Sequence, residues 1–282
     1  MKSTAMSTVQ VVAMCASQAI EYSVNSHYVI RFINCILWAI QCCLSILQGF
    51  AFISSCTFLR ARSHTKRCAH EPIDRSIINI FQGMSIAFIC DGNRRYMKKQ
   101  GLGDPFERDD GLDKIYELIQ FAYTYDIREV SFFCFAIKNF KRKSSEVDGI
   151  MNIIRDKFKS PEEKNIRIKA KIMVYGRLDL VKEDIRDKLI LIQNETQFNQ
   201  DILVNIFFAY SAEDEIIQGI KFNNNVDLLI RTGNEKRLSD FMIRQVAQGT
   251  SVFFAKPLWP EISSTHLFLI LLKHKLEDRY LL

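Results

Sequence analysis

The chain has 282 residues, of which 48% are hydrophobic and 25% are charged, and this composition excludes a disordered or low-complexity protein. Its net charge of +6 is too small an excess to predict nucleic-acid binding by itself, and we expect no nucleic-acid partner. The eight cysteines contain no C-x-x-C pair and the five histidines are scattered. We therefore expect free thiols in a reducing compartment rather than a zinc site.

The first quarter of the chain contains a long segment without charge. The 28 positions between Arg31 and Arg60 carry no charged residue, and roughly 20 apolar residues in a helix are enough to cross a bilayer. We expect a membrane-anchoring helix at about residues 32–54, although an interfacial helix or a hydrophobic helix packed on the domain fits the same pattern. Basic residues follow it at Arg60, Arg62, Lys66 and Arg67. The positive-inside rule then places the remainder of the chain in the cytosol.

From about residue 83 onward, apolar runs alternate with stretches of helical periodicity. The predicted strands are residues 85–90, 130–136, 168–174, 202–209, 226–230 and 251–254, and the predicted helices are 110–125, 144–159, 178–194, 212–221 and 239–248. Near-continuous apolar strands indicate a sheet buried on both faces. We predict an α/β domain at residues 83–282, with a mostly parallel central sheet of about six strands flanked by helices. Residues 1–82 would form an N-terminal region that contains the hydrophobic helix and a basic linker.

Polar residues follow the first predicted strand directly, at Asp91, Gly92, Asn93, Arg94 and Arg95. Ligands of open α/β sheets bind beyond the carboxyl ends of the strands. Backbone N–H groups at a helix start and arginine side chains bind anions there, and a carboxylate can hold Mg²⁺ against a phosphate. The alternative is that Asp91 only caps the helix and that the arginines are exposed.

A second cluster follows a later strand. Arg231 stands at the end of that strand, Arg237 and Ser239 precede the next predicted helix, and Gly233 allows a tight turn between them. The two arginines and the helix-start hydroxyl predict a second anion site, the alternative being a polar loop capped by Ser239. Two anion sites at one edge of a sheet indicate a pair of substrates that carry phosphates.

These motifs resemble those of the cis-prenyltransferases, the family of undecaprenyl diphosphate synthase. The segments that carry the resemblance are 86–96, 229–241 and 258–261, with further matches in the same order at 139–142, 145–149 and 208–210. The Asn-Arg-Arg-Tyr form of the first segment is similar to the eukaryotic dehydrodolichyl diphosphate synthase branch. The resemblance covers about residues 83–275. It implies a transferase that condenses isopentenyl diphosphate in cis onto allylic (farnesyl) diphosphate, which makes a long polyprenyl diphosphate for dolichol and protein glycosylation.

The resemblance also implies roles for individual residues. Asp91 would hold Mg²⁺ on the diphosphate and act in catalysis together with Asn93. The residues implied for the allylic diphosphate are Gly92, Arg94, Arg95, Asn139 and Arg142, and those implied for isopentenyl diphosphate are Arg231, Arg237 and Ser239. An apolar tunnel would receive the hydrocarbon, and Phe132, Phe133, Phe135 and Phe140 either contribute to it or simply pack in the core.

Several positions depart from the family pattern. Asp104 and Arg108 stand where an Arg and a His are usual, and Ala136 and Lys138 replace a Ser and a Glu. The last residues lack the Arg-x-Gly that single-subunit members supply across a dimer, so we expect a dimer with a partner subunit that carries it. We expect the endoplasmic reticulum membrane as the location. The alternatives are a noncatalytic partner subunit, against which the presence of Asp91 argues, or a membrane scaffold that keeps only the fold.

Overall fold

Six parallel strands form the centre of the described chain. The computed structural model describes residues 79–101, 109–219 and 222–280. The strands are β1 (Ser85–Ile89), β2 (Glu129–Ala136), β3 (Ala170–Tyr175), β4 (Ile202–Tyr210), β5 (Leu228–Arg231) and β6 (Ser251–Phe254). Their order is β3-β4-β2-β1-β5-β6 and every neighbouring pair is parallel. The predicted α/β fold with a parallel sheet is confirmed.

Helices connect the strands, as predicted, and the main differences from the predicted ranges concern three of them. The helices are α4 (Asn93–Lys99), α5 (Asp110–Thr124), α6 (Ser144–Lys157), α7 (Glu183–Glu195), α8 (Ala212–Gln218), α9 (Ile243–Ala247) and α10 (Ser264–Tyr280), with short 3-10 helices η1 (Asn79–Phe81), η2 (Ile137–Lys141) and η3 (Leu178–Leu180). The helix predicted from residue 178 begins only at Glu183, because Val181 is extended. The helix predicted from residue 239 begins only at Ile243, because left-handed residues precede it. Helix α10 was not predicted, since its apolar residues do not gather on one face.

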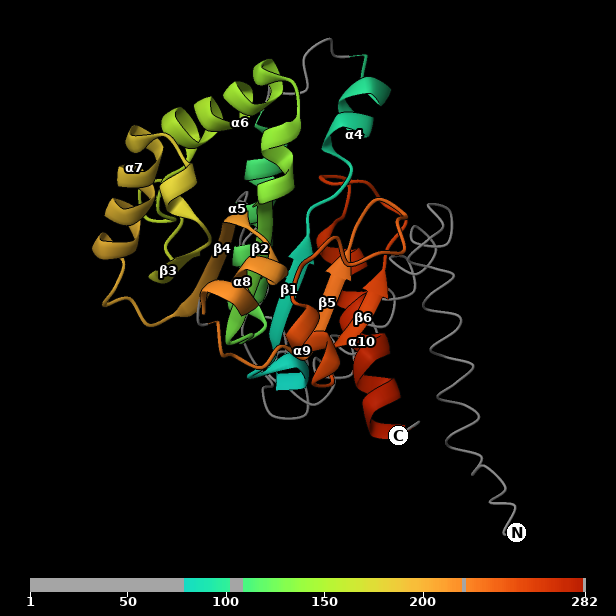
Figure 1. Ribbon diagram of the computed structural model, residues 1–282. Coiled ribbons are helices and arrows are strands. Elements are labelled where there is room, and N and C mark those ends of the chain that lie inside the picture. The colour runs from blue at the N-terminus through green and yellow to red at the C-terminus, as the bar shows by residue number, and fades with distance from the viewer. Residues whose placement is uncertain (1–78, 102–108, 220–221, 281–282) are drawn as a thin grey trace, which may run out of the picture.

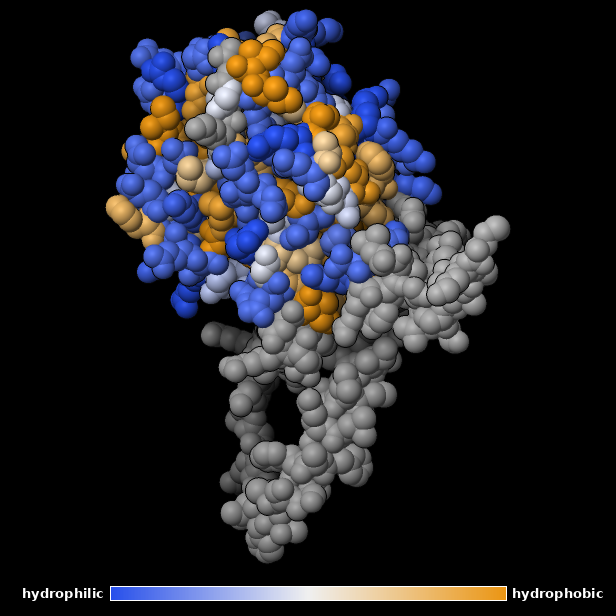
Figure 2. Space-filling view, turned by 60° about the horizontal axis from the view of Figure 1, so that its bottom comes forward, coloured by the Kyte–Doolittle hydropathy of each residue, from blue (hydrophilic) through white to orange (hydrophobic). Residues whose placement is uncertain are grey.

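The two faces of the sheet carry separate apolar cores. Phe88 and Phe132 stack on one face with ring centroids 5.5 Å apart, and α5, α6, α7 and α10 cover this face. Ile89 and Phe133 belong to the opposite face, where α8 and α9 lie in front of the sheet (Figure 1). On the face of the described residues that Figure 2 shows, most side chains are hydrophilic and the hydrophobic ones gather in separate clusters. This is the layered arrangement expected for strands that are apolar on both sides.

The strand order creates a crevice beside β1. Strands β1 and β5 are neighbours, with Ile89 paired to Arg231, but the main helices that follow them, α5 and α9, cover opposite faces. At such a switch point the loops diverge and leave room for a ligand at the carboxyl ends of the strands.

Two predictions concern residues outside the described ranges. The hydrophobic helix expected at residues 32–54 lies there, as do Asp104 and Arg108. Among residues 79–101, 109–219 and 222–280, no helix is both long and apolar enough to cross a membrane.

Candidate active site

A cavity of about 820 Å³ opens at the carboxyl ends of β1, β2 and β5. All ten residues predicted for the site line it, namely Asp91, Gly92, Asn93, Arg94, Arg95, Asn139, Arg142, Arg231, Arg237 and Ser239. Apolar side chains of α5, α6, β2 and β4 line it as well, including Leu112, Ile115, Ile150, Ile153, Phe133 and Phe208. The cavity therefore combines a strongly cationic part with an apolar part.

The carboxylate of Asp91 is held between two arginines. Its Oδ2 accepts a hydrogen bond of 2.7 Å from Nη2 of Arg231, and its Oδ1 lies 3.3 Å from Nη2 of Arg95. Arg231 is only 3% exposed, and its Nη1 donates to Oγ of Ser239 at 2.5 Å and to the carbonyl of Arg237. The two clusters predicted separately from the sequence are thus one hydrogen-bonded network, here called the β1–β5 wall (Asp91, Arg95, Arg231, Thr232 and residues 237–240).

The capping part of both alternatives is wrong, although Arg94 and Arg95 are exposed, as the first alternative holds. Gly92, not Asp91, is the N-cap of α4, and no side chain caps that helix. Ser239 is also not at a helix start, because it has a φ of 53° and α9 begins later, at Ile243. Its hydroxyl instead accepts the hydrogen bond from Arg231.

Backbone contacts fix Asp91 in place. The Asp91 N–H donates to Oγ1 of Thr232 at 3.0 Å, and the same hydroxyl donates to the Asp91 carbonyl at 2.7 Å. Gly233 must be small, since a Cβ there would lie 2.9 Å from the Asp91 carbonyl oxygen, and its φ of 86° favours glycine. The Trp259 N–H donates to the Asp91 carbonyl at 2.9 Å. Sequence reasoning gave no role to Thr232, although its position directly after Arg231 at the same strand end was a usable signal.

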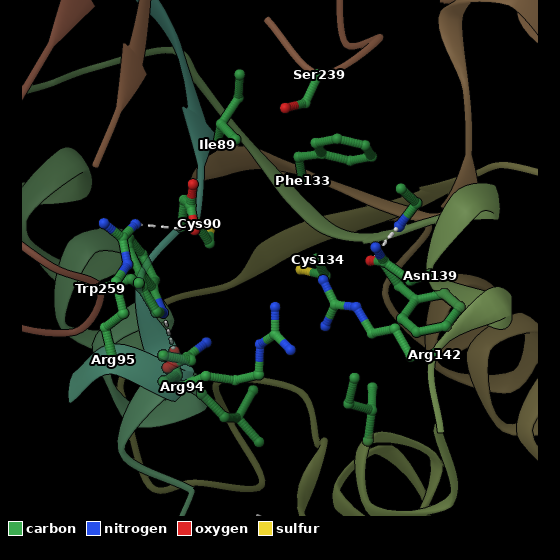
Figure 3. A pocket seen from close by; sticks show the side chains of 18 of the residues that line it. Ile89, Cys90, Arg94, Arg95, Phe133, Cys134, Asn139, Arg142, Ser239 and Trp259 are labelled. Carbon is green, nitrogen blue, oxygen red and sulfur yellow. Dashed lines mark hydrogen bonds and ion pairs between the residues drawn. The ribbon is translucent and has the colours of Figure 1, made fainter. Parts of the chain in front are cut away.

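The opposite side of the cavity is here called the η2 wall (Asn139, Arg142 and Glu146). Its positive charges are less fully paired with carboxylates than those of the β1–β5 wall. Oδ1 of Asn139 accepts a hydrogen bond of 3.0 Å from the Ala136 N–H, so this side chain holds the turn of η2. Arg94 reaches this wall from α4, with Nη1 3.4 Å from Oε1 of Glu146. The guanidinium groups of Arg94 and Arg142 extend toward the same part of the cavity (Figure 3).

Of the five described arginines that line the cavity, Arg142 is the one whose positive charge is not paired with a carboxylate. Among the residues that the structure describes, it forms no ion pair and no hydrogen bond through its side chain. Burial lowers the pKa of the Arg142 guanidinium, and the charge of Arg94 lowers it further, whereas Glu146 and Asp91 raise it. A half-buried cation that faces another cation favours an anion between them.

The apolar part of the cavity contains two thiols. Cys90 follows β1 and Cys134 lies on β2, and both line the cavity (Figure 3). Burial raises the pKa of the Cys134 thiol to about 12 and raises that of Cys90 well above its usual value. Both are therefore neutral thiols at physiological pH. Of the four phenylalanines considered for a tunnel, Phe133 and Phe135 line the cavity, while Phe132 is fully buried and Phe140 packs on Phe135.

Comparison with known proteins decides the family. The family model described as putative undecaprenyl diphosphate synthase matches residues 89–223 and 220–281. The chain belongs to the cis-prenyltransferase family. The resemblance inferred from the motifs is thereby confirmed.

Individual relatives of this cis-prenyltransferase carry related names. A protein of Encephalitozoon cuniculi (strain GB-M1) named dehydrodolichyl diphosphate synthase is 53% identical over 270 residues, which cover 95% of this chain and 96% of that protein. A Homo sapiens protein named dehydrodolichyl diphosphate synthase complex subunit is 31% identical, over 70% of this chain and 68% of its own. The crystal structure of lavandulyl diphosphate synthase from Lavandula x intermedia, in complex with dimethylallyl diphosphate, superposes with a TM-score of 0.61 at 22% identity. It covers 70% of this chain and 96% of that one, and it shows the shared fold.

The side chains of this cis-prenyltransferase suit a metal ion whose remaining ligands come from the substrate. In the part of the chain that the structure describes, no three His, Cys, Asp or Glu side chains gather into a metal site. Magnesium is usually bound through one or two carboxylates together with phosphate oxygens of a substrate. Asp91 offers one such carboxylate beside arginines that attract phosphates, so the residues fit this kind of site.

Proposed function

We propose that this chain is the catalytic subunit of a polycis-polyprenyl diphosphate synthase. It condenses isopentenyl diphosphate in cis onto an allylic diphosphate such as farnesyl diphosphate, and the product is a dehydrodolichyl diphosphate for dolichol. The observation that carries this proposal is the cavity itself. The Asp91 carboxylate and several guanidiniums stand next to an apolar space, which matches substrates with a diphosphate head and a hydrocarbon tail.

The side chains divide between the two substrates. Arg94, Arg142 and Asn139 of the η2 side, with Arg95 and the Gly92 loop, bind the allylic diphosphate, and Asn93 donates its amide to the same group. Arg231, Ser239 and Arg237 of the β1–β5 wall bind isopentenyl diphosphate. Holding both heads at one sheet edge brings the two reacting carbons together, which lowers the entropic part of the barrier.

The reaction breaks a C–O bond and a C–H bond and forms a C–C bond. The allylic C–O bond breaks, inorganic diphosphate leaves with the bonding electrons, and the double bond of isopentenyl diphosphate attacks the allylic cation. The new cation then loses a proton to a base such as the released diphosphate, and the C–H electrons form the new double bond. Arg94 and Arg142 stabilise the negative charge on the leaving group. Magnesium, held by Asp91 and the diphosphate, would supply further neutralisation of that charge. Phe133, Phe135 and the neutral thiols exclude water that would quench the cation.

Incubation of the purified chain with farnesyl diphosphate, labelled isopentenyl diphosphate and Mg²⁺ tests this function. We expect chloroform-soluble labelled products whose length is read by thin-layer chromatography after dephosphorylation. Absence of product both alone and with a cis-prenyltransferase partner, under conditions in which a known member is active, would favour the scaffold alternative.

A partner subunit is part of the proposal. The human relative is named as a subunit of a complex, and we propose that a related subunit with a C-terminal Arg-x-Gly joins this chain in a dimer. We expect the partner to raise the rate at least about tenfold, which corresponds to about 1.4 kcal/mol of the barrier. Full activity of the purified chain, unchanged when the partner is added, would contradict this part.

Attachment to the endoplasmic reticulum membrane is proposed on the sequence alone. The uncharged segment at residues 32–54 and its basic flank support an anchor with the catalytic domain in the cytosol. Alkaline carbonate extraction of membranes from cells that express the full chain is the test. Release of the chain into the supernatant would contradict the anchor.

A further inference from the structure

Lys138, which stands where the family usually has a Glu, contacts the opposite wall. Its Nζ lies 3.6 Å from Oδ2 of Asp240, which belongs to the segment between β5 and α9. Both residues line the cavity. The Lys138 side chain is 69% exposed and that of Asp240 is 18% exposed. The ion pair therefore joins η2, next to Asn139, with the segment that contains Ser239.

Asp240 is itself fixed to the start of α8. Its Oδ2 accepts a hydrogen bond of 2.6 Å from Oγ of Ser211, and its Oδ1 accepts one of 3.1 Å from the Glu213 N–H. Its carbonyl accepts from the Ala212 N–H at 2.9 Å. One carboxylate thus receives a hydroxyl, an amide and an ammonium group from two different elements.

The segment around Asp240 has an unfavourable backbone. Ser239, Asp240 and Met242 have φ values of 53°, 63° and 51°, in the left-handed region that residues other than glycine seldom adopt. Such residues persist only where the surroundings hold them. Between them, Phe241 is fully buried and stacks on Phe133 with ring centroids 4.5 Å apart. The contacts of Asp240 and Phe241 are what hold Ser239 against Arg231.

We propose that Lys138 and Asp240 are positioning residues that set the affinity of the β1–β5 wall for isopentenyl diphosphate. This inference rests on the proposed function. Lys138 draws Asp240 toward η2, and Asp240 keeps residues 237–242 in the conformation that presents Ser239 and Arg237 to the substrate. The pair also couples the two walls, because η2 carries Asn139 of the allylic side. A lysine in place of the usual glutamate is what makes this attraction to Asp240 electrostatically favourable.

A double-mutant cycle tests the pair. The variants are Lys138→Met, Asp240→Asn and their combination, with Lys138→Arg as the conservative variant. We expect each single variant to raise the KM for isopentenyl diphosphate about three- to fivefold, as for loss of a partly exposed ion pair, with kcat changed less than about twofold. The double variant should be no worse than Asp240→Asn alone, because Asp240→Asn already removes the ion pair that Lys138→Met removes. Lys138→Arg should restore most of the affinity.

A matched control separates position from charge. Lys141 is exposed on the same 3-10 helix and forms no ion pair within the described residues, so Lys141→Met should leave the KM unchanged. If Lys138→Met raised the KM while Asp240→Asn lowered it, Lys138 would bind substrate directly and the positioning role would be overturned. Additive effects of the two changes, or no effect of either, would overturn it as well.

Hydrogen exchange gives a readout that needs no turnover. We expect the amide hydrogens of peptides that span residues 237–242 to exchange faster than in wild type in both Lys138→Met and Asp240→Asn. Lys141→Met should exchange at the wild-type rate. If the wild-type chain bound no isopentenyl diphosphate while the two variants still showed faster exchange, the proposed function would be disproved and the coupling of the walls would stand. Unchanged exchange in both variants would overturn the coupling itself.

Discussion

The β1–β5 wall and the η2 wall face the same cavity but are stabilised differently. In the β1–β5 wall, the buried Arg231 donates to Asp91 at 2.7 Å and to Ser239 at 2.5 Å, so its charge is paired and both of its terminal nitrogens are hydrogen-bonded before any ligand arrives. Its buried Nε has no partner within the described residues. In the η2 wall, Arg142 has no ion pair within the described residues and faces Arg94. The first wall is preorganised, whereas the second gains stability when an anion binds. We expect mutations in the two walls to have different signatures.

The largest expected effect is at Asp91. Asp91→Asn keeps the size of the side chain and one acceptor for Arg231, but it removes the negative charge. We expect kcat to fall at least about 100-fold, the scale for loss of one electrostatic group in an active site, with little change in far-UV circular dichroism. Asp113→Asn, at a half-exposed ion pair on α5, is the control. A kcat within twofold of wild type would refute the role of Asp91.

A substitution of Arg142 should weaken substrate binding without lowering the stability of the fold. Arg142→Met removes a half-buried cation that has no ion-pair partner among the described residues, so we expect the free energy of unfolding to stay the same or to increase. The KM for the allylic diphosphate should rise roughly tenfold or more, because a hydrogen bond to a charged group contributes about 1.5–3 kcal/mol. Steady-state kinetics and urea unfolding measure the two quantities, with the exposed Arg167→Met as control. A clear loss of stability without a change in KM would place Arg142 in the scaffold instead.

Asn139 tests whether the η2 wall is shaped by its own side chains. Asn139→Ala removes the acceptor for the Ala136 N–H, and we expect a loss of about 0.5–1.5 kcal/mol of unfolding free energy. Asn139→Asp keeps that acceptor and should restore most of the stability. Urea unfolding followed by tryptophan fluorescence provides the measurement. Equal midpoints for Asn139→Ala and wild type would show that η2 does not need this bond.

The smallest effect near neutral pH is expected for Cys134, which lies on β2 and lines the cavity. Burial raises its pKa from 9.0 to about 12, so the neutral thiol contributes its full stability below pH 9.0 and that contribution is lost as the pH rises toward about 12. Urea unfolding at about pH 8 and about pH 10.5 should show a smaller decline for Cys134→Ala than for wild type. An identical decline would mean that the thiol is not buried in solution.

The sequence alone determined the strands and the positions of the site residues. Continuous apolar runs marked all six strands, because burial on both faces requires them, and the polar residues after β1 and β5 marked the ligand edge. It did not predict α10, whose apolar residues lack a single face. It also gave too early a start for α9, because the left-handed residues before Ile243 are held by distant contacts of Asp240 and Phe241.

Only the tertiary structure decided how the site residues interact. The ion pair of Asp91 and Arg231 joins positions 140 apart in the sequence, and it exists because the parallel register sets Ile89 beside Arg231. The contact of Lys138 with Asp240 likewise joins η2 with the segment before α9, which no local pattern relates. Hydrophobic periodicity and turn residues predict the local secondary structure of a segment. Charge pairing across a cavity depends on strand order, register and the path of each loop, which the whole chain fixes together.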